Sequence, residues 1–281
     1  MKTFLPLTLS LLSVTALAAN PNSSTNSTTL TFNVDLGAEY DSNVNIVEID
    51  ATSNQNDMAA VLNAGANFQW KPSKAFTLKS GLAYSNKRYQ DVQDFDVAIR
   101  RGLVDASYDF QWFNLGGSYH RADANVASEP FLNLTQKSIY ASRLFGEQWF
   151  VRLARVQKEK QFDNASDRDS HSDGFEADLY VFFNAAKNFI AFGFAAEEES
   201  ALDPQYSNDG FSVKARFSNK FKLGSKEAKF QMGWRYSERD YVGVTPEINE
   251  TRFDKRHVLD AEWEVHWNEH VGLSARLERG D

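Results

Sequence analysis

The stretch LTFNVDLGAEY, residues 30–40, alternates apolar and polar side chains without a break. Its even positions hold leucine, phenylalanine, valine, alanine and tyrosine, and its odd positions hold threonine, asparagine, aspartate, glycine and glutamate. Successive side chains of a β-strand point to opposite faces, whereas those of an α-helix repeat every 3.6 residues. The stretch therefore predicts a strand with one apolar face and one polar face.

Twelve further segments show the same alternation. It is clear over residues 62–70, 104–112, 175–183, 211–218, 230–237 and 259–267, and less regular over residues 75–88, 114–121, 134–145, 148–158, 188–197 and 270–279. A transmembrane β-barrel has this pattern, because one face of each strand meets lipid and the other meets a polar lumen. We therefore predict an all-β fold, an antiparallel up-and-down transmembrane β-barrel in the bacterial outer membrane.

The expected connections alternate between short and long. The short ones are residues 71–74, 113–114, 146–148, 184–187, 221–226 and 268–270, and the long ones are about 41–57, 89–96, 122–133, 159–173, 198–209 and 240–254. Outer-membrane barrels have short periplasmic turns and longer extracellular loops, so the first strand is expected to run outward. Aromatic residues beside the short turns predict a girdle at the inner interface. The alternative is a soluble β-sandwich with these aromatics in its core.

The number of predicted strands, thirteen, is odd. Bacterial single-chain barrels close with an even number of strands. The residues Gly280-Asp281 have the composition of the start of another loop, which favours a fourteenth strand after the last residue of this sequence. A barrel closed by twelve strands is the alternative.

The first nineteen residues have the three parts of a secretory signal peptide. Lys2 supplies the positive charge, residues 4–14 are mostly apolar, and Ala16-Leu17-Ala18 fits the small-residue cleavage rule. The expected domains are a signal peptide over residues 1–19, a disordered periplasmic tether over 20–29, and the barrel over 30–281. An uncleaved membrane anchor is the alternative for the first segment. The chain has no cysteine, which excludes disulfides and thiolate metal sites.

Charged residues fall in two places, the long loops and the polar faces of the strands. The loops are strongly acidic, which suits a solvated surface, divalent-ion bridging to lipopolysaccharide, or attraction of cations to a pore mouth. The strand charges predict cross-strand pairs that brace the wall, a solute path with a transverse field, or both. Acidic residues of segment 259–267 are expected to meet arginines of segments 230–239 and 270–279. The two lysines of segment 75–88 are expected to meet charges on segment 101–109. The candidate lumen residues are Lys79, Asp105, Asp109, Glu176, Asp178, Lys214, Arg216, Arg235, Arg239, Asp260, Glu262, Glu264 and Arg276.

The sequence contains few patterns typical of a catalytic or metal site. None of the five histidines has the spacing of a helical metal site. Residues 169–174, DSHSDG, bring a nucleophile, a base and an acid together, but a catalytic triad depends on geometry rather than adjacency. We therefore expect no enzyme activity, no cofactor and no metal. There is no basic patch for nucleic acid.

The opening strand ends in GAEYDSNV, residues 37–44, which resembles the start of a broad group of Gram-negative barrels. The group includes the barrel domain of surface lipoprotein assembly modifiers and small porin-like proteins near polysaccharide-export genes. Residues 271–279, VGLSARLER, resemble the penultimate strand of the modifier barrels. The resemblance implies fourteen strands. The modifiers also carry a helical-repeat domain before the barrel, where this chain has only the short tether.

Three functions fit these features. The first is a porin-like channel for small polar solutes, and the second is an accessory barrel for export or surface assembly of lipoprotein or polysaccharide. The third is a structural or adhesive barrel that acts through its acidic loops. The expected partners are outer-membrane lipid and lipopolysaccharide, the barrel-assembly machinery, and either small polar solutes or an exported lipoprotein or glycan.

Overall fold

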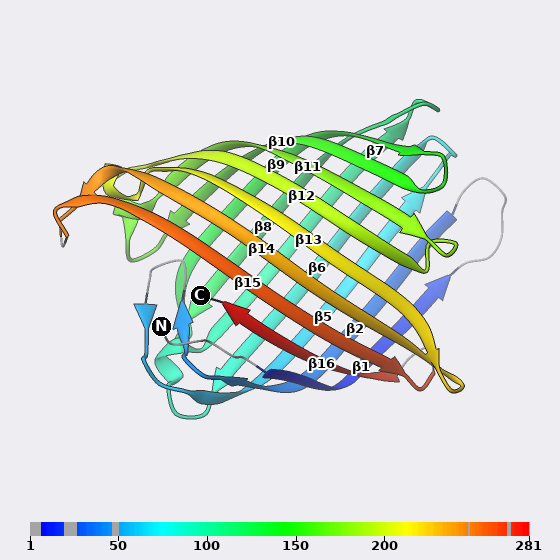
Figure 1. The fold of residues 1–281 in the computed structure, drawn as a ribbon, viewed down its shortest axis with the longest axis horizontal. Helices are drawn as coiled ribbons and strands as arrows, with labels where there is room; N and C mark the ends of the chain where they lie inside the picture. Colours follow the sequence, from blue (N-terminus) through cyan, green and yellow to red (C-terminus); the bar gives the residue numbers. More distant parts are fainter. Residues whose placement is uncertain (1–6, 20–26, 47–50, 247, 269–270, 281) are drawn as a thin grey trace.

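The computed structural model describes residues 7–19, 27–46, 51–246, 248–268 and 271–280, with backbone alone for 7–19. Fourteen described strands pair in an antiparallel closed barrel (Figure 1). They are β1 (Leu7–Ala19), β2 (Ser27–Asp41), β5 (Asp57–Lys71), β6 (Phe76–Tyr89), β7 (Val97–Asp109), β8 (Asn114–Val126), β9 (Glu129–Phe145), β10 (Trp149–Phe162), β11 (Ser170–Phe183), β12 (Asn188–Ala201), β13 (Asn208–Leu223), β14 (Lys226–Thr245), β15 (Glu250–His266) and β16 (Val271–Gly280). A separate hairpin joins β3 (Asn45–Ile46) and β4 (Ala51–Thr52). None of the described segments forms a helix long and apolar enough to cross a membrane.

The apolar faces of the strands point away from the barrel interior. Leu36 on β2 is 47% exposed, Leu82 on β6 is 71% exposed, and Ile139 on β9 is 70% exposed. A soluble sandwich would bury such side chains between two sheets. Here a continuous outer belt is apolar and uncovered, which is the arrangement of a barrel surrounded by lipid. The predicted barrel is confirmed, and the sandwich alternative is wrong.

In the structure, the fourteenth strand of the closed barrel is β1, from the start of the chain. The backbone of β1 pairs with β2 from Leu7–Tyr40 to Ala19–Thr29, and with β16 over a shorter, irregular register. The strand count therefore agrees with fourteen and not with twelve. The segment that closes the barrel is the one for which the sequence predicts a signal peptide, and its cleavage stays a prediction.

Most strands continue further than the alternating pattern predicts. The polar segments 122–133 and 240–254 were expected to be loops, but β8 and β9 are joined by Ala127 and Ser128 alone, and β14 extends to Thr245. Backbone pairing explains the difference, because ladder hydrogen bonds continue where side chains become polar. Strand β7 shows the reverse. It ends at Asp109, so the expected strand residues 110–112 lie in a turn.

The short turns carry the aromatic side chains that the sequence places there. Trp112 is 65% exposed and packs edge-on against Phe113, with ring centroids 4.6 Å apart. Trp70 and Phe76 form a similar pair across the β5–β6 turn, with centroids 6.4 Å apart. Exposed aromatic rings at one end of an apolar belt are typical of a membrane interface.

Candidate functional site: the inner face of the barrel

The inner face is formed by the strand positions between the exposed apolar ones. On β7, Asp105 alternates with Val104 and Tyr108, which are 49% and 47% exposed on the outside. The same alternation applied to the other strands puts every candidate lumen residue on the inner face. This set comprises Lys79 on β6, Asp105 and Asp109 on β7, Glu176 and Asp178 on β11, Lys214 and Arg216 on β13, Arg235 and Arg239 on β14, Asp260, Glu262 and Glu264 on β15, and Arg276 on β16.

Several ion pairs join strands that are two places apart, and two of those made by the candidate residues cross a glycine. Lys214 Nζ lies 3.0 Å from Asp178 Oδ1, and the lysine passes over β12 at Gly193. Further round the wall, an ion pair of 3.6 Å joins Arg216 on β13 to Asp260 on β15. The strand between them has Gly233 at this point, where a Cβ would overlap the Asp260 carboxylate. The glycines make room for side chains that lie flat against the wall.

Two more contacts of this kind involve residues that sequence reasoning missed. The Tyr140 hydroxyl on β9 donates to Asp105 on β7 at 2.9 Å, and its ring covers Gly116 on the strand between. Lys158 on β10 pairs with Glu197 on β12. In the sequence, a glycine on the polar face of a strand could have indicated that side chains of its two neighbouring strands meet over it.

Neighbouring strands also pair directly, through basic residues that the sequence analysis did not single out. Lys229 Nζ lies 3.2 Å from Glu264 Oε1, and the two residues are cross-strand partners in the β14–β15 register. Arg152 on β10 lies between two carboxylates of β11, 3.4 Å from Glu176 and 3.6 Å from Asp178. These contacts brace adjacent strands, in agreement with the prediction that charged residues form cross-strand pairs in the wall.

Several expected pairs are not formed. Asp260 was expected to meet arginines of β14, but its ion pair is with β13, and Arg276 binds Glu278 on its own strand at 2.6 Å. Lys87 was expected to meet charges on β7, but it binds Glu39 at 2.8 Å and Asp41 at 2.5 Å on β2. The reason is that long side chains lean along tilted strands and reach past the nearest neighbour.

Two remaining candidates, Lys79 on β6 and Asp109 on β7, lie at different levels of the wall. Lys79 is the cross-strand partner of Asp105, whose carboxylate accepts from Tyr140. Asp109 lies at the end of β7, where its Oδ1 accepts from the backbone N–H of Gln111 at 2.7 Å. Asp109 therefore shapes a turn.

Charge is unevenly distributed around the inner face. From Asn208 to Lys220 on β13 and from Lys229 to Tyr241 on β14, the inner positions hold basic and neutral residues and no acid. Acidic residues gather instead on β15 and on β2. A cavity of about 800 Å³ lies against the basic strands, and its basic lining includes Lys214, Arg235, Arg239 and Arg256. The flanking strands contribute acids to the same cavity, namely Glu176, Glu197, Asp260 and Glu278.

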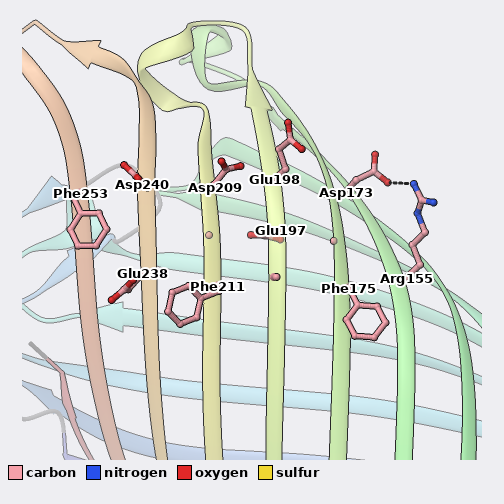
Figure 2. A pocket seen from close by; sticks show the side chains of 13 residues that line it. Arg155, Asp173, Phe175, Glu197, Glu198, Asp209, Phe211, Glu238, Asp240 and Phe253 are labelled. Atoms are coloured by element: carbon pink, nitrogen blue, oxygen red, sulfur yellow. Dashed lines mark hydrogen bonds and ion pairs between the residues drawn. The ribbon is translucent and has the colours of Figure 1, made fainter.

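On the outer face, apolar side chains give way to acidic ones near the long-loop end of the barrel (Figure 2). Phe175, Phe211 and Phe253 form a row of exposed rings. Four acidic side chains, Asp173, Glu198, Asp209 and Asp240, lie on the loop side of these rings, around a shallow depression of about 740 Å³. A fifth, Glu238, lies level with Phe211, its cross-strand partner. Arg155 forms an ion pair of 3.2 Å with Asp173. The change from rings to carboxylates marks the upper edge of the apolar belt, and the sequence analysis missed this second aromatic row.

The YDSN motif anchors the first long loop. Asp41 accepts hydrogen bonds from Lys87 and from the Tyr89 hydroxyl, and Asn43 accepts one from Thr52 in the β3–β4 hairpin at 3.1 Å. Val44 follows the motif and is fully buried in a small cluster with Tyr89 and Ala59. The motif residues therefore fold the loop back onto the start of β5 and the end of β6.

The DSHSDG segment does not assemble as a triad. His171 Nε2 contacts Asp173 Oδ2 at 3.2 Å, and both residues lie on the outer face of β11. Ser170 and Ser172 alternate with them and face inward, where Ser170 donates to Glu199 at 2.5 Å. Across the described residues, no group of three or more acidic or histidine side chains has the geometry to hold a metal ion.

A closed antiparallel barrel with an uncovered apolar belt and a polar inner face defines the class, a bacterial outer-membrane β-barrel. No family model matches the chain, and no curated protein matches it. Among solved structures, it is similar to in-vitro folded OmpT, an outer membrane protein of Vibrio cholerae, with 8% identity, a TM-score of 0.42, and coverage of 99% of this chain and 96% of that chain.

Two further solved structures are similar. The COG4313 outer membrane channel from Pseudomonas putida F1 has 10% identity, a TM-score of 0.44, and coverage of 99% of this chain and 95% of that chain. OccK5 of Pseudomonas aeruginosa has 12% identity, a TM-score of 0.34, and coverage of 100% and 97%. At these identities and TM-scores, none of the three similarities assigns a function to the chain.

Proposed function

We propose that the chain is an outer-membrane channel for small polar solutes. The observation that carries the proposal is the direction of the ion pairs. Each one found among the described residues joins positions on one strand, on neighbouring strands, or on strands two places apart. None of them crosses from one wall to the opposite wall. The charged side chains therefore brace the wall and do not tie a plug across the middle.

The size of the barrel supports the same function. Fourteen strands spaced about 4.8 Å apart and tilted by about 40° enclose a circle about 28 Å across, measured between backbones. Eight-stranded barrels are narrow enough for side chains to fill. A wider barrel whose inner side chains lie along the wall leaves room for water and a hydrated solute.

Planar-bilayer recording of the refolded full chain tests the proposal. We expect steady single-channel conductance, and we expect Arg216→Glu on the inner face to change it. Arg155→Gln is the matched control, because Arg155 lies on the outer face with 75% of its side chain exposed. A folded, heat-modifiable barrel that never conducts would exclude the channel and leave the adhesive or assembly functions.

The remaining expectations follow from this function. The belt is proposed to contact outer-membrane lipid, the acidic rim lipopolysaccharide, and the nascent chain the barrel-assembly machinery. No enzyme activity is proposed, because the serines of the DSHSDG segment face away from its histidine.

An accessory role in lipoprotein or polysaccharide export is the second candidate. It rests on the sequence resemblance at residues 37–44 and 271–279. The first stretch has a local structural explanation in the loop contacts of Asp41, Asn43 and Val44, which lowers its weight as a functional signal. Finding a lipoprotein or glycan-export gene beside this one, with loss of the exported product on deletion, supports the accessory role.

A further inference from the structure

Three cations form a row across the basic wall. Lys214 on β13 and Arg235 on β14 are direct cross-strand partners. Arg256 on β15 is the diagonal neighbour of Arg235, two positions from its direct partner Val258. Direct and diagonal cross-strand neighbours on one face lie about 5 and 7–8 Å apart. All three side chains line the inner cavity of about 800 Å³.

Two of the three cations form no ion pair within the described part of the chain. Asp260, the other diagonal neighbour of Arg235 on β15, is already bound by Arg216. Lys214 is bound to Asp178, whereas Arg235 and Arg256 make no ion pair or hydrogen bond with any residue that the structure describes. Across the β14–β15 pairing, Arg235 lies opposite Val258 and Arg256 lies opposite Ser237, and neither partner carries charge. Across the β13–β14 pairing, Arg235 faces the like charge of Lys214. Like charges that face each other across strands are destabilising. An anion between them would relieve the repulsion.

Arg239, on the same strand, has acidic neighbours that compensate its positive charge. Its cross-strand partner on β15 is Asp254, and Glu197 and Glu199 lie close enough to interact with it electrostatically. Arg235 differs, because its direct partner on β15 is uncharged and its acidic diagonal neighbour Asp260 is bound by Arg216. Arginine presents several N–H donors in a fork that matches the oxygens of carboxylate and phosphate groups.

We propose that Arg235, Arg256 and Lys214 form a binding site for the carboxylate or phosphate group of a small anionic solute inside the barrel. The inference deepens the proposed channel and rests on it for the solute's route. The acidic rim opposes anion entry only weakly, because exposed charges are screened beyond about 8 Å at physiological salt. Charges inside the wall are screened less, so at the site the positive potential of the cationic row exceeds the negative potential of the acidic rim.

Calorimetric titration of the refolded full chain in detergent with inorganic phosphate tests the site without requiring conduction. We expect saturable binding that weakens about thirtyfold in the Arg235→Gln/Arg256→Gln double variant, because each unit charge about 4 Å from the bound anion contributes a factor of about five to six in water. The Arg155→Gln control is expected to bind like the wild type. No saturable binding by the folded wild type, or equal binding by the double variant, overturns the site.

Electrical recording separates failure of this site from failure of the channel. Phosphate binding without conductance keeps the site and excludes the channel. In a conducting barrel under a KCl gradient, the double variant is expected to lower the chloride-to-potassium permeability ratio by about fourfold. An unchanged ratio contradicts the site even when the channel is open.

Discussion

Lys214 on β13 reaches over β12 to Asp178 on β11, and the space its stem fills is the space that a side chain at Gly193 would need. The ion pair and the glycine are therefore one structural unit. Such a unit couples three strands, which adjacent cross-strand pairs cannot do. Because the lysine side chain is 56% exposed, the ion pair itself contributes less than about 1 kcal/mol to stability.

Alanine at two of the crossing glycines is expected to have unequal effects. At Gly193 the new Cβ meets the flexible stem of Lys214, which can swing into the lumen, so Gly193→Ala is expected to cost less than about 1 kcal/mol. At Gly116 the Cβ would overlap the Tyr140 ring and lie 2.9 Å from the carbonyl oxygen of Ala106. Gly116→Ala is therefore expected to cost about 1–3 kcal/mol. Urea titration of vesicle-refolded barrels, followed by tryptophan fluorescence, measures both. Equal costs would contradict the argument.

The Tyr140 hydroxyl offers a separate test of the three-strand contacts. Tyr140→Phe keeps the ring over Gly116 and beside Arg152, whose guanidinium lies 4.5 Å from the ring centroid. It removes the hydroxyl that donates to Asp105. We expect a loss of about 1–3 kcal/mol, because hydrogen bonds to charged groups are stronger than neutral ones. A Tyr140→Phe/Asp105→Asn double-mutant cycle in the same assay measures the coupling. Additive effects of the two changes would show that the hydroxyl does not stabilise the wall through Asp105.

The alternation of residues predicts which side of the wall each residue faces. Leu36 and Asp35 point to opposite faces because successive side chains of any strand do so, independently of the other strands. The inner position of Arg235 follows from the same local rule. This is why strand identity and facing were predictable from single segments.

Contacts between strands were not predictable in the same way. The pairing of Arg216 with Asp260 depends on strand register and tilt, which no single segment contains. Some predicted loop lengths were wrong for a related reason. Polar composition predicts a loop around residues 122–133, but the ladder continues to a tight turn at Ala127 and Ser128, both with positive φ. Neither residue is the glycine or asparagine that normally signals such a turn.

The buried Val44 side chain is expected to hold the first long loop in place. Val44→Ala removes contacts with Ala59 and Tyr89, and we expect a local cost of about 1–3 kcal/mol. The loss concerns the loop, so limited proteolysis of the folded barrel between residues 44 and 56 should accelerate while the urea midpoint of the barrel stays nearly constant. Val242→Ala is the control, because Val242 is 66% exposed. Equal protease sensitivity in both variants would mean that the cluster does not secure the loop.

Residues 7–19 satisfy two incompatible requirements, a cleavable leader by sequence and the closing strand β1 in the structure. The sequence rule predicts that protein exported in a Gram-negative host begins at Ala19 or Asn20, which N-terminal sequencing of the outer-membrane fraction measures. The structure offers the opposing test. Thr15 and Asn33 are cross-strand partners, so cysteines at these positions form a disulfide only if β1 stays in the wall. Exported protein that retains residue 15 and forms this cross-link would overturn the leader and make β1 a permanent strand. Cleavage without the cross-link would leave the edges of β2 and β16 to be joined by another strand or by each other.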